Sequence, residues 1–477
     1  MTIMASFIFF LLVFVGIGIA STLRHKSNTE DYLLAGQSVK PWLVALSAIA
    51  TYNSGFMFVG MTGYTYLHGL ASIWIMVGFI VGDLLASLFI HKRLRKVSED
   101  SEVLSYPTAL SRWNKTDFRK LRFLGGLISI LFLGAYAAAQ LGAGSKALHV
   151  LFGWNYAWGA IIGTIIVVAY CFAGGIRASI WTDAAQSVVM IASMAILAVF
   201  GIEAAGGFDQ FYLSLKNVSP DYLSLATHTA PFAFIGPIVW VLSWTFGGFG
   251  VVGQPHVMGR FMSMDDASNM TRTRIYYYCW YVSFFALTIL VGMVSRVLIP
   301  NSGSFDAELA LPTLAMQLLP DVLVGLILAG LFAAPMSTAD SQILSCSASA
   351  TNALYQGGRV HYLWTKLATV TVALLALAIA LVGPRNIFVL VNASAGSLAS
   401  AFGPLLVVYA LGQKPSERLT LAMVLSGCIV SLSWRFAGLS DFAFEVMPGM
   451  IAGGLVFSVG KLLGMEYTPR SKSLPSD

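Results

Sequence analysis

Apolar segments as long as a membrane-spanning helix recur along almost the whole chain, separated by short polar connections. A helix that crosses the hydrocarbon core of a bilayer needs about 20 apolar residues, and about 13 segments meet that length. The pattern therefore predicts an all-α membrane protein with about 13 transmembrane helices, arranged as a single polytopic domain over residues 1–477. The predicted spans centre near Val13, Met57, Val77, Ser129, Ile165, Met194, Val239, Ala286, Ala329, Ala373, Leu390, Leu425 and Ile451.

The amino-acid composition excludes a water-soluble protein. Hydrophobic residues make up 57% of the chain and charged residues only 10%, whereas soluble domains carry about 25% charged residues. The net charge of +6 does not indicate a nucleic-acid partner, because the basic residues are spread over short loops. The expected partners are the lipid bilayer and a small-molecule substrate, with no nucleic acid and no obligate protein partner evident.

The distribution of basic residues predicts how the chain is oriented. Lys and Arg are most concentrated between residues 92 and 122, and cytoplasmic loops carry an excess of these residues. If this segment is cytoplasmic, alternation over the predicted spans places most other basic residues in cytoplasmic loops, Arg260 among them. We expect an inner (plasma) membrane protein with its N-terminus outside and its C-terminus in the cytoplasm.

Two of the predicted spans are interrupted by glycine, at residues 43–64 and 234–253. They lie five spans apart and therefore cross the membrane in opposite senses. This pattern is typical of an inverted repeat whose broken helices expose backbone groups near the membrane midplane. The alternative is that the glycines only allow helices to pack closely. We predict repeats over residues 41–204 and 230–411, and extra helices at 4–21, 416–436 and 444–464.

A polar run over residues 333–341 interrupts a membrane-length apolar segment. Its polar side chains are Ser337, Thr338, Asp340 and Ser341. Hydroxyl and carboxylate groups at membrane depth mostly face a cavity, an ion or a substrate path. Pro335 partly frees the Ala334 carbonyl from the helical ladder, and small hard cations prefer several oxygen ligands. The run therefore predicts a cation site, although each hydroxyl could instead bond the carbonyl one turn earlier.

Asp183 lies near the cytoplasmic start of its predicted span. A carboxylate in a first helical turn can simply complement the helix dipole. It can also serve a function at membrane depth, and both interpretations stay open on the sequence alone.

Several motifs together resemble the sodium/solute symporter family, and the likeness covers nearly the whole chain. They are Asp31-Tyr32-Leu33-Leu34-Ala35-Gly36, Ala45-Leu46-Ser47-Ala48, Ser54-Gly55, Gly174-Gly175, Trp181-Thr182-Asp183 and Ala334-Pro335-Met336-Ser337-Thr338. The stretch from Gly253 to Met262 looks closest to the proline permease branch. The resemblance implies a leucine-transporter-like fold with a five-plus-five inverted repeat and two broken helices.

The resemblance also implies positions for the ligands. The sodium site would use the carbonyls of Ala50, Asn53 and Ala334 and the hydroxyls of Ser337 and Thr338. A second cation site would use Asp183 with Ser337, Asp340 and Ser341. Substrate would contact Ser54, Phe56 and Tyr136, to which helical spacing adds Gln140 and Trp244.

This sequence departs from the proline permease branch at several positions. Tyr52 stands where that branch often has a carboxylate, Phe56 where it has a larger aromatic residue, and Gly247 where it has a tryptophan. Asp340 stands where relatives usually have a small or hydroxyl residue. Two carboxylates beside one pocket repel each other, so we hypothesise that Asp183 and Asp340 together bind a second cation or that one of them titrates.

The predicted function is sodium-coupled symport that imports a small organic nutrient, an amino acid such as proline foremost. The alternatives are a sodium- or proton-coupled symporter for a sugar, a pantothenate-like acid or another carboxylate, and a solute-sensing membrane protein. The sensor is disfavoured because only a short polar stretch follows Lys461. We expect no enzymatic activity, and the coupling ion Na⁺ is the one cofactor predicted.

Overall fold

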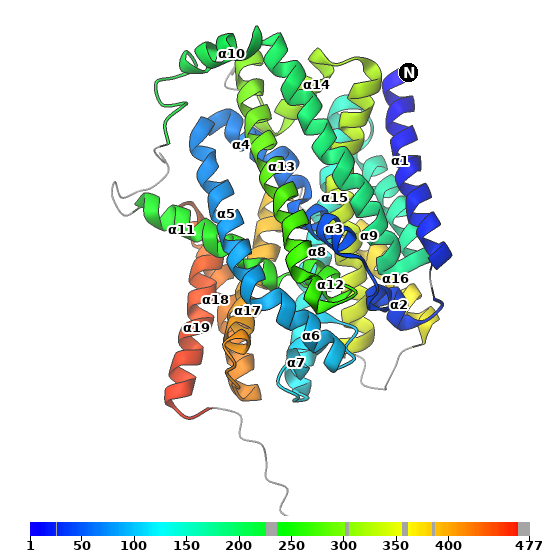
Figure 1. Ribbon diagram of the computed structural model, residues 1–477, viewed down its shortest axis with the longest axis vertical. Helices are drawn as coiled ribbons and strands as arrows, with labels where there is room; N and C mark the ends of the chain where they lie inside the picture. The colour runs from blue at the N-terminus through cyan, green and yellow to red at the C-terminus, as the bar shows by residue number, and fades with distance from the viewer. Residues whose placement is uncertain (25, 226–235, 301–304, 355–360, 384–386, 466–477) are drawn as a thin grey trace, which may run out of the picture.

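The computed structural model describes residues 1–24, 26–225, 236–300, 305–354, 361–383 and 387–465 (Figure 1). Within these ranges the chain is helical, apart from turns and an isolated β-bridge between Val39 and Met264. The predicted start of the second repeat, residue 230, lies outside the described residues.

The structure contains long helices joined by short ones. The longer helices are α1 (Thr2–Ala20), α3 (Pro41–Gly55), α5 (Ile73–Ala86), α8 (Arg119–Phe152), α9 (Tyr156–Ala204), α11 (Gly236–Phe249), α13 (Met270–Leu298), α15 (Asp321–Ala348), α16 (Tyr362–Val382), α17 (Ile387–Ala410), α18 (Glu417–Phe436) and α19 (Val446–Leu462). The shorter α-helices are α2 (Thr29–Leu34), α4 (Met61–His68), α6 (Lys92–Asp100), α7 (Tyr106–Arg112), α10 (Gly207–Lys216), α12 (Pro255–Met262) and α14 (Ala310–Leu318). The π-helical segments are η3 (Phe56–Gly60), η5 (Ser87–His91) and η9 (Ser349–Leu354). The 3₁₀ segments are η1 (Ser21–Arg24), η2 (Ala35–Gln37), η4 (Gly69–Ser72), η6 (Gly250–Gly253), η7 (Ala267–Asn269), η8 (Ala307–Leu309) and η10 (Leu439–Asp441).

Ten helical stretches of the described chain are long and apolar enough to cross a membrane. Two of them, Pro41–Asp100 and Tyr156–Ala204, each contain two of the predicted span centres. The last predicted centre, Ile451, lies in the shorter apolar helix α19. The all-helical membrane class is thus confirmed, while the count of about 13 spans stays a prediction.

Helix α15 lies at the centre of the bundle. In the segment Asp321–Leu354, 83% of the most apolar stretch is buried, against 22% for α1 and for α16. It packs against α1, α3, α8 and α9. The polar run 333–341 is therefore enclosed by protein on all sides rather than exposed to lipid.

The first glycine-interrupted segment is broken where the sequence suggested. Within α3 the backbone of Ser54 has φ 47° and ψ −174°, a conformation that costs free energy for a residue with a Cβ and that clusters at functional sites. Directly after the second segment the chain is extended at Gln254 (φ −97°, ψ 100°), between η6 and α12. Both interruptions lie beside the site described below.

Glycines of the second segment also allow close helix packing, which was the alternative interpretation. A Cβ atom on Gly248 would lie 2.1 Å from the Phe79 carbonyl oxygen, and one on Gly82 would lie 1.9 Å from the Thr245 carbonyl oxygen. These glycines therefore let α5 and α11 touch backbone to backbone. Close packing therefore explains Gly248, while the inverted repeat stays a prediction.

The two ends of the bundle carry different elements. The N-terminus, α10 and α14 lie at one end, and the short helices α6 and α7 lie at the other (Figure 1). Helix α6 carries part of the basic cluster, including Lys92, Arg93 and Lys96. The basic end of the molecule is thus opposite the N-terminus.

Candidate cation and substrate site

Hydroxyl and carbonyl oxygens of α15 and α3 meet in the centre of the bundle. The Ser337 Oγ lies 3.2 Å from the Ala50 carbonyl and 3.0 Å from the Ala334 carbonyl. The Thr338 Oγ1 lies 3.0 Å from the Thr51 carbonyl and 3.2 Å from the Ala334 carbonyl. Each hydroxyl has one hydrogen to donate, so several lone pairs at this junction remain available to a cation. Neutral oxygens of this kind are ligands for a small hard cation.

Four of the five predicted sodium ligands therefore share hydrogen bonds in one cluster, and the fifth, Asn53, has other hydrogen-bond partners. The Asn53 carbonyl accepts the Phe56 N–H, and its amide Nδ2 donates to the Ile49 carbonyl at 2.7 Å. The Thr51 carbonyl contacts the Thr338 hydroxyl instead. Sequence reasoning missed Thr51 because every residue has a carbonyl, and only the path of the backbone selects one.

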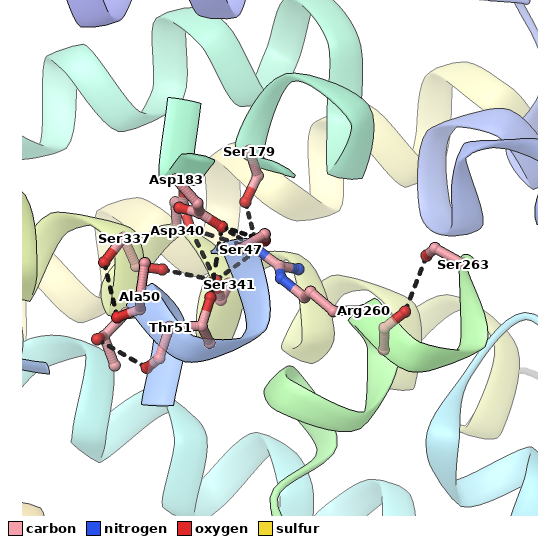
Figure 2. A network of polar contacts seen from close by, with 12 residues as sticks. Ser47, Ala50, Thr51, Ser179, Asp183, Arg260, Ser263, Ser337, Asp340 and Ser341 are labelled. Atoms are coloured by element: carbon pink, nitrogen blue, oxygen red, sulfur yellow. Dashed lines mark hydrogen bonds and ion pairs between the residues drawn. The ribbon is translucent and has the colours of Figure 1, made fainter. Parts of the chain in front are cut away.

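The predicted second cation site contains a buried arginine (Figure 2). The Arg260 Nη2 lies 3.2 Å from Asp183 Oδ2, 3.7 Å from Asp340 Oδ1 and 2.5 Å from Ser341 Oγ, and it also donates to the Ser179 hydroxyl. The two carboxylates and the guanidinium are all at most 1% exposed. Counted with all three groups ionised, two negative charges face one positive charge, and the cluster has one excess negative charge.

Hydroxyl groups connect this charged cluster to the first one. Ser47 donates to Asp183 Oδ2 at 2.7 Å. Thr51 Oγ1 lies 3.3 Å from the same oxygen and 2.9 Å from Ser341 Oγ. Tyr170 donates to the other carboxylate, Asp340 Oδ2, at 2.6 Å. The predicted residues Asp183, Asp340 and Ser341 are therefore brought together, directly beside the oxygens of α3 and α15.

The placement of Arg260 in a cytoplasmic loop was wrong. Pro255 begins α12 at a position where a missing N–H costs nothing, and α12 carries Arg260 into the interior, where it is 1% exposed. A signal was present, since Arg260 is flanked by Val257, Met258 and Phe261, and a buried charge needs a partner. The positive-inside rule counts the charge of a residue and carries no information on its burial.

A cavity adjoins the break in α3. Its lining residues are Tyr52, Asn53, Ser54, Phe56, Met57, Phe79, Tyr136, Trp244, Gly247, Gln254, His256, Tyr281, Val391, Asn392, Ala395, Ala399, Phe444 and Val446. Four of the five predicted substrate residues are in this set. The fifth, Gln140, lies behind the wall, where its Oε1 accepts the Gly55 N–H at 3.3 Å. The cavity volume of about 70 Å³ suits a compact solute.

The cavity wall combines aromatic faces with polar atoms that have no hydrogen-bond partner in the described part of the chain. These polar atoms are Asn53 Oδ1, Trp244 Nε1, Gln254 Oε1 and both ring nitrogens of His256. A buried donor or acceptor left without a partner costs about 1–3 kcal/mol, so a bound ligand that satisfies these atoms gains affinity. None of the lining residues is Asp, Glu, Lys or Arg.

Several lining residues were missed by the sequence analysis. Tyr281, His256, Asn392 and Phe444 lie on elements that carried no glycine break or polar run. Aromatic and amide residues in apolar segments are usually satisfied packing residues, so their type alone gives no signal. Only the three-dimensional arrangement brings them to one cavity.

The fold and the site together define a multi-pass membrane transporter of a small molecule. The sequence profile of the Sodium:solute symporter family matches residues 32–427. The chain belongs to this family.

Relatives of known name support this membership. The sodium/proline symporter of Salmonella typhimurium (strain LT2) is 28% identical over 459 residues, which cover 93% of this chain and 90% of that protein. The high-affinity proline transporter PutP of Bacillus subtilis (strain 168) is also 28% identical, over 92% of this chain and 94% of the relative. A Na⁺-coupled sialic acid symporter, solved in a substrate-bound outward-open state, matches with a TM-score of 0.85 at 16% identity, with 99% of each chain covered. At that identity the structural likeness establishes the fold alone.

Proposed function

We propose that this protein is a sodium-coupled secondary active symporter that imports a small amino acid, proline foremost. The observation that carries the proposal is the cluster of α15 hydroxyls and α3 carbonyls directly beside a small cavity with neutral lining. Membership of the family and the proline transporters among its relatives favour the same substrate. The sodium ligands we propose are the carbonyls of Ala50, Asn53 and Ala334 and the hydroxyls of Ser337 and Thr338, with Thr51 added from its contact with Thr338.

The proposed architecture is the five-plus-five inverted repeat, with repeats over residues 41–204 and 230–411 and extra helices at 4–21, 416–436 and 444–464. We place the N-terminus outside and the C-terminus in the cytoplasm. The position of the basic helix α6 at the end opposite the N-terminus supports this orientation, because basic residues favour the cytoplasmic side.

The break at Ser54 prepares the cavity for a carboxylate. The half-helix that starts after Ser54 directs its backbone N–H groups and the positive end of its dipole toward the break. Gly55 N–H donates there to a side-chain oxygen, Gln140 Oε1, at 3.3 Å, which a ligand oxygen can replace. Together with Trp244 Nε1, which has no hydrogen-bond partner among the described residues, the Gly55 N–H would bind the carboxylate of an amino acid.

The ion would couple to transport by joining two elements that move relative to each other. Sodium bound between α3 and α15 stabilises the state in which these helices are in contact, and substrate then binds at the break. One charge that moves through about 100 mV releases about 2.3 kcal/mol, and an about tenfold sodium gradient adds about 1.4 kcal/mol. The sum supports an about 500-fold accumulation of substrate per sodium ion, which is sufficient for nutrient uptake.

Uptake of labelled proline into proteoliposomes tests this function. An inward sodium gradient is expected to drive accumulation above equilibrium, and a proton gradient in sodium-free buffer is not. Accumulation driven by protons alone would instead favour the proton-coupled alternative. A thermal-shift screen of the purified protein against sugars, vitamin-like acids and amino acids, with and without sodium, identifies the substrate if proline gives no uptake.

We also propose that Asp183, Asp340 and Ser341 bind a second cation beside Arg260. The support is the formal charge of about −1 in a site that excludes water, to which Asp340 contributes one carboxylate. Asp340→Ser removes that charge and is expected to lower the charge moved per proline by the charge of the second cation. Reversal-potential measurements on proteoliposomes give this ratio. An unchanged ratio together with an unchanged pH dependence of uptake would refute the second site.

A further inference from the structure

The loop between α18 and α19 reaches the substrate cavity. The family match ends at residue 427, yet Phe444 and Val446, which follow it in the chain, line the cavity together with residues of α3 and α11. The loop before α19 and the first residue of α19 therefore contribute to the wall of the site.

The Phe444 ring stacks on the Trp244 ring. Their centroids are 4.8 Å apart and their planes differ by 19°. A Cβ atom on Gly247, one turn after Trp244 on α11, would lie 2.9 Å from Cδ1 and Cε1 of Phe444. The Phe444 ring therefore occupies space that is open only because residue 247 is a glycine.

The segment that carries Phe444 is firmly held. The neighbouring Glu445 is 1% exposed, and its Oε1 accepts a hydrogen bond from Arg435 Nη1 at 2.6 Å. A Cβ atom on Gly396 of α17 would lie 3.0 Å from Glu445 Cγ, which shows how closely the two segments pack. The Trp434 Nε1–H donates to two carbonyls of the same loop, those of Leu439 at 3.0 Å and Ala443 at 2.9 Å. These contacts fix the Phe444 ring between α11 and α17.

We propose that Phe444 is a specificity-determining residue of the transporter, which contacts the apolar part of the substrate and limits its size on that side of the cavity. This inference rests on the proposed function. An aromatic ring held by its own loop is a rigid wall, because the adjoining Trp244 and Glu445 contacts prevent it from moving aside. A compact ring such as that of proline fits against it, whereas one additional methylene group meets the Phe444 face.

Uptake kinetics of proline and of its six-membered-ring homologue, pipecolate, test the proposal. The variant F444A is expected to raise the KM for proline about tenfold with kcat within about twofold of wild type. The ratio of kcat/KM for pipecolate to that for proline is expected to rise at least about fivefold. The matched control is F436A, which removes an aromatic residue of the same hairpin that is 83% exposed. It is expected to leave both parameters unchanged.

Further variants separate a role in specificity from a role in folding. F444Y restores the ring and is expected to recover most of the affinity for proline. Because Gly247 and Phe444 share one space, G247A is expected to raise the KM for proline as well, and F444A is expected to remove that additional effect. Monodispersity and thermal stability of each purified variant verify that it folds.

A proline KM and a pipecolate ratio at wild-type values in F444A would overturn the role of Phe444. If the wild type takes up neither compound, the proposed substrate is wrong. In that case, the affinity of F444A is measured for the nutrient that stabilises the purified wild type in the thermal-shift screen. F444A is expected to bind this nutrient more weakly than the wild type. Unchanged affinity there overturns the inference, and a screen in which no nutrient stabilises the wild type overturns it together with the proposed function.

Discussion

Replacement of both Ser337 and Thr338 by alanine is expected to raise the sodium concentration for half-maximal uptake at least about a hundredfold. A hydrogen bond or contact to a charged group contributes about 1.5–3 kcal/mol, and two such hydroxyls therefore account for at least about 100-fold in ion affinity. Both hydroxyls lie at the junction with the α3 carbonyls, so the double variant removes two oxygens from the proposed site.

Initial rates of proline uptake over a range of sodium concentrations measure this effect. The control is Thr288→Ala on α13, which removes a buried hydroxyl that donates only to the carbonyl one turn earlier, Phe284, at 2.9 Å. This control is expected to keep the wild-type sodium dependence. A double alanine variant that is folded and still saturates at the wild-type sodium concentration would contradict the proposed ligand set.

Removal of the Arg260 charge has the second largest expected effect. Arg260→Gln leaves the Asp183 and Asp340 carboxylates buried without their positive partner. Breaking a buried ion pair from one side costs about 3–5 kcal/mol. After heating that leaves the purified wild type folded, the variant is therefore expected to be mostly unfolded. The fraction of protein that remains monodisperse measures this loss.

Charge balance provides the test of that explanation. The double variant R260Q/D340S removes one charge of each sign and returns the cluster to the formal charge of the wild type. It is expected to recover much of the stability that R260Q loses, and the surface variant R272Q is expected to lose none, because Arg272 is exposed. Equal instability of R260Q and the double variant would show that the guanidinium acts by packing rather than by charge.

The central part of the site could be predicted from sequence because its chemistry is costly in a membrane. Hydroxyls and a carboxylate at 337–341 are conspicuous in an apolar segment, and the structure places them in contact with α3 and Asp183. The break near Ser54 was also predictable, since the glycines around it weaken the helix. In both cases a local rule is violated, and the violation marks the site.

The remaining parts of the site depend on long-range packing, which no local pattern encodes. The Thr51 carbonyl is one of many identical groups, and only its contact with Thr338 distinguishes it. Phe444 stacks on Trp244, 200 positions earlier in the chain, and the sequence around Phe444 has no feature that distinguishes it from an ordinary loop. Arg260 was treated as a loop residue because its charge outweighed the apolar residues beside it.

The fold shows the same division between local and long-range information. Apolar segments predict the helices well, but the long helix Tyr156–Ala204 is interrupted at a non-helical residue, Gly175 (φ 58°, ψ −140°). A Cβ atom at Gly175 would lie 2.2 Å from the Tyr32 carbonyl oxygen, so the chain turns there against a distant segment. The number of membrane crossings thus depends on such contacts as well as on hydropathy.

Equilibrium binding of proline and sodium to the purified protein tests most directly the claim that oxygens from α3 and α15 couple the ion to the substrate. Sodium is expected to lower the Kd of proline, and proline is expected to lower the Kd of sodium by the same factor, because linkage between two sites is reciprocal. In Thr338→Ala that factor is expected to fall close to one. A proline Kd that does not respond to sodium in the wild type, or a coupling factor unchanged in Thr338→Ala, would contradict the account.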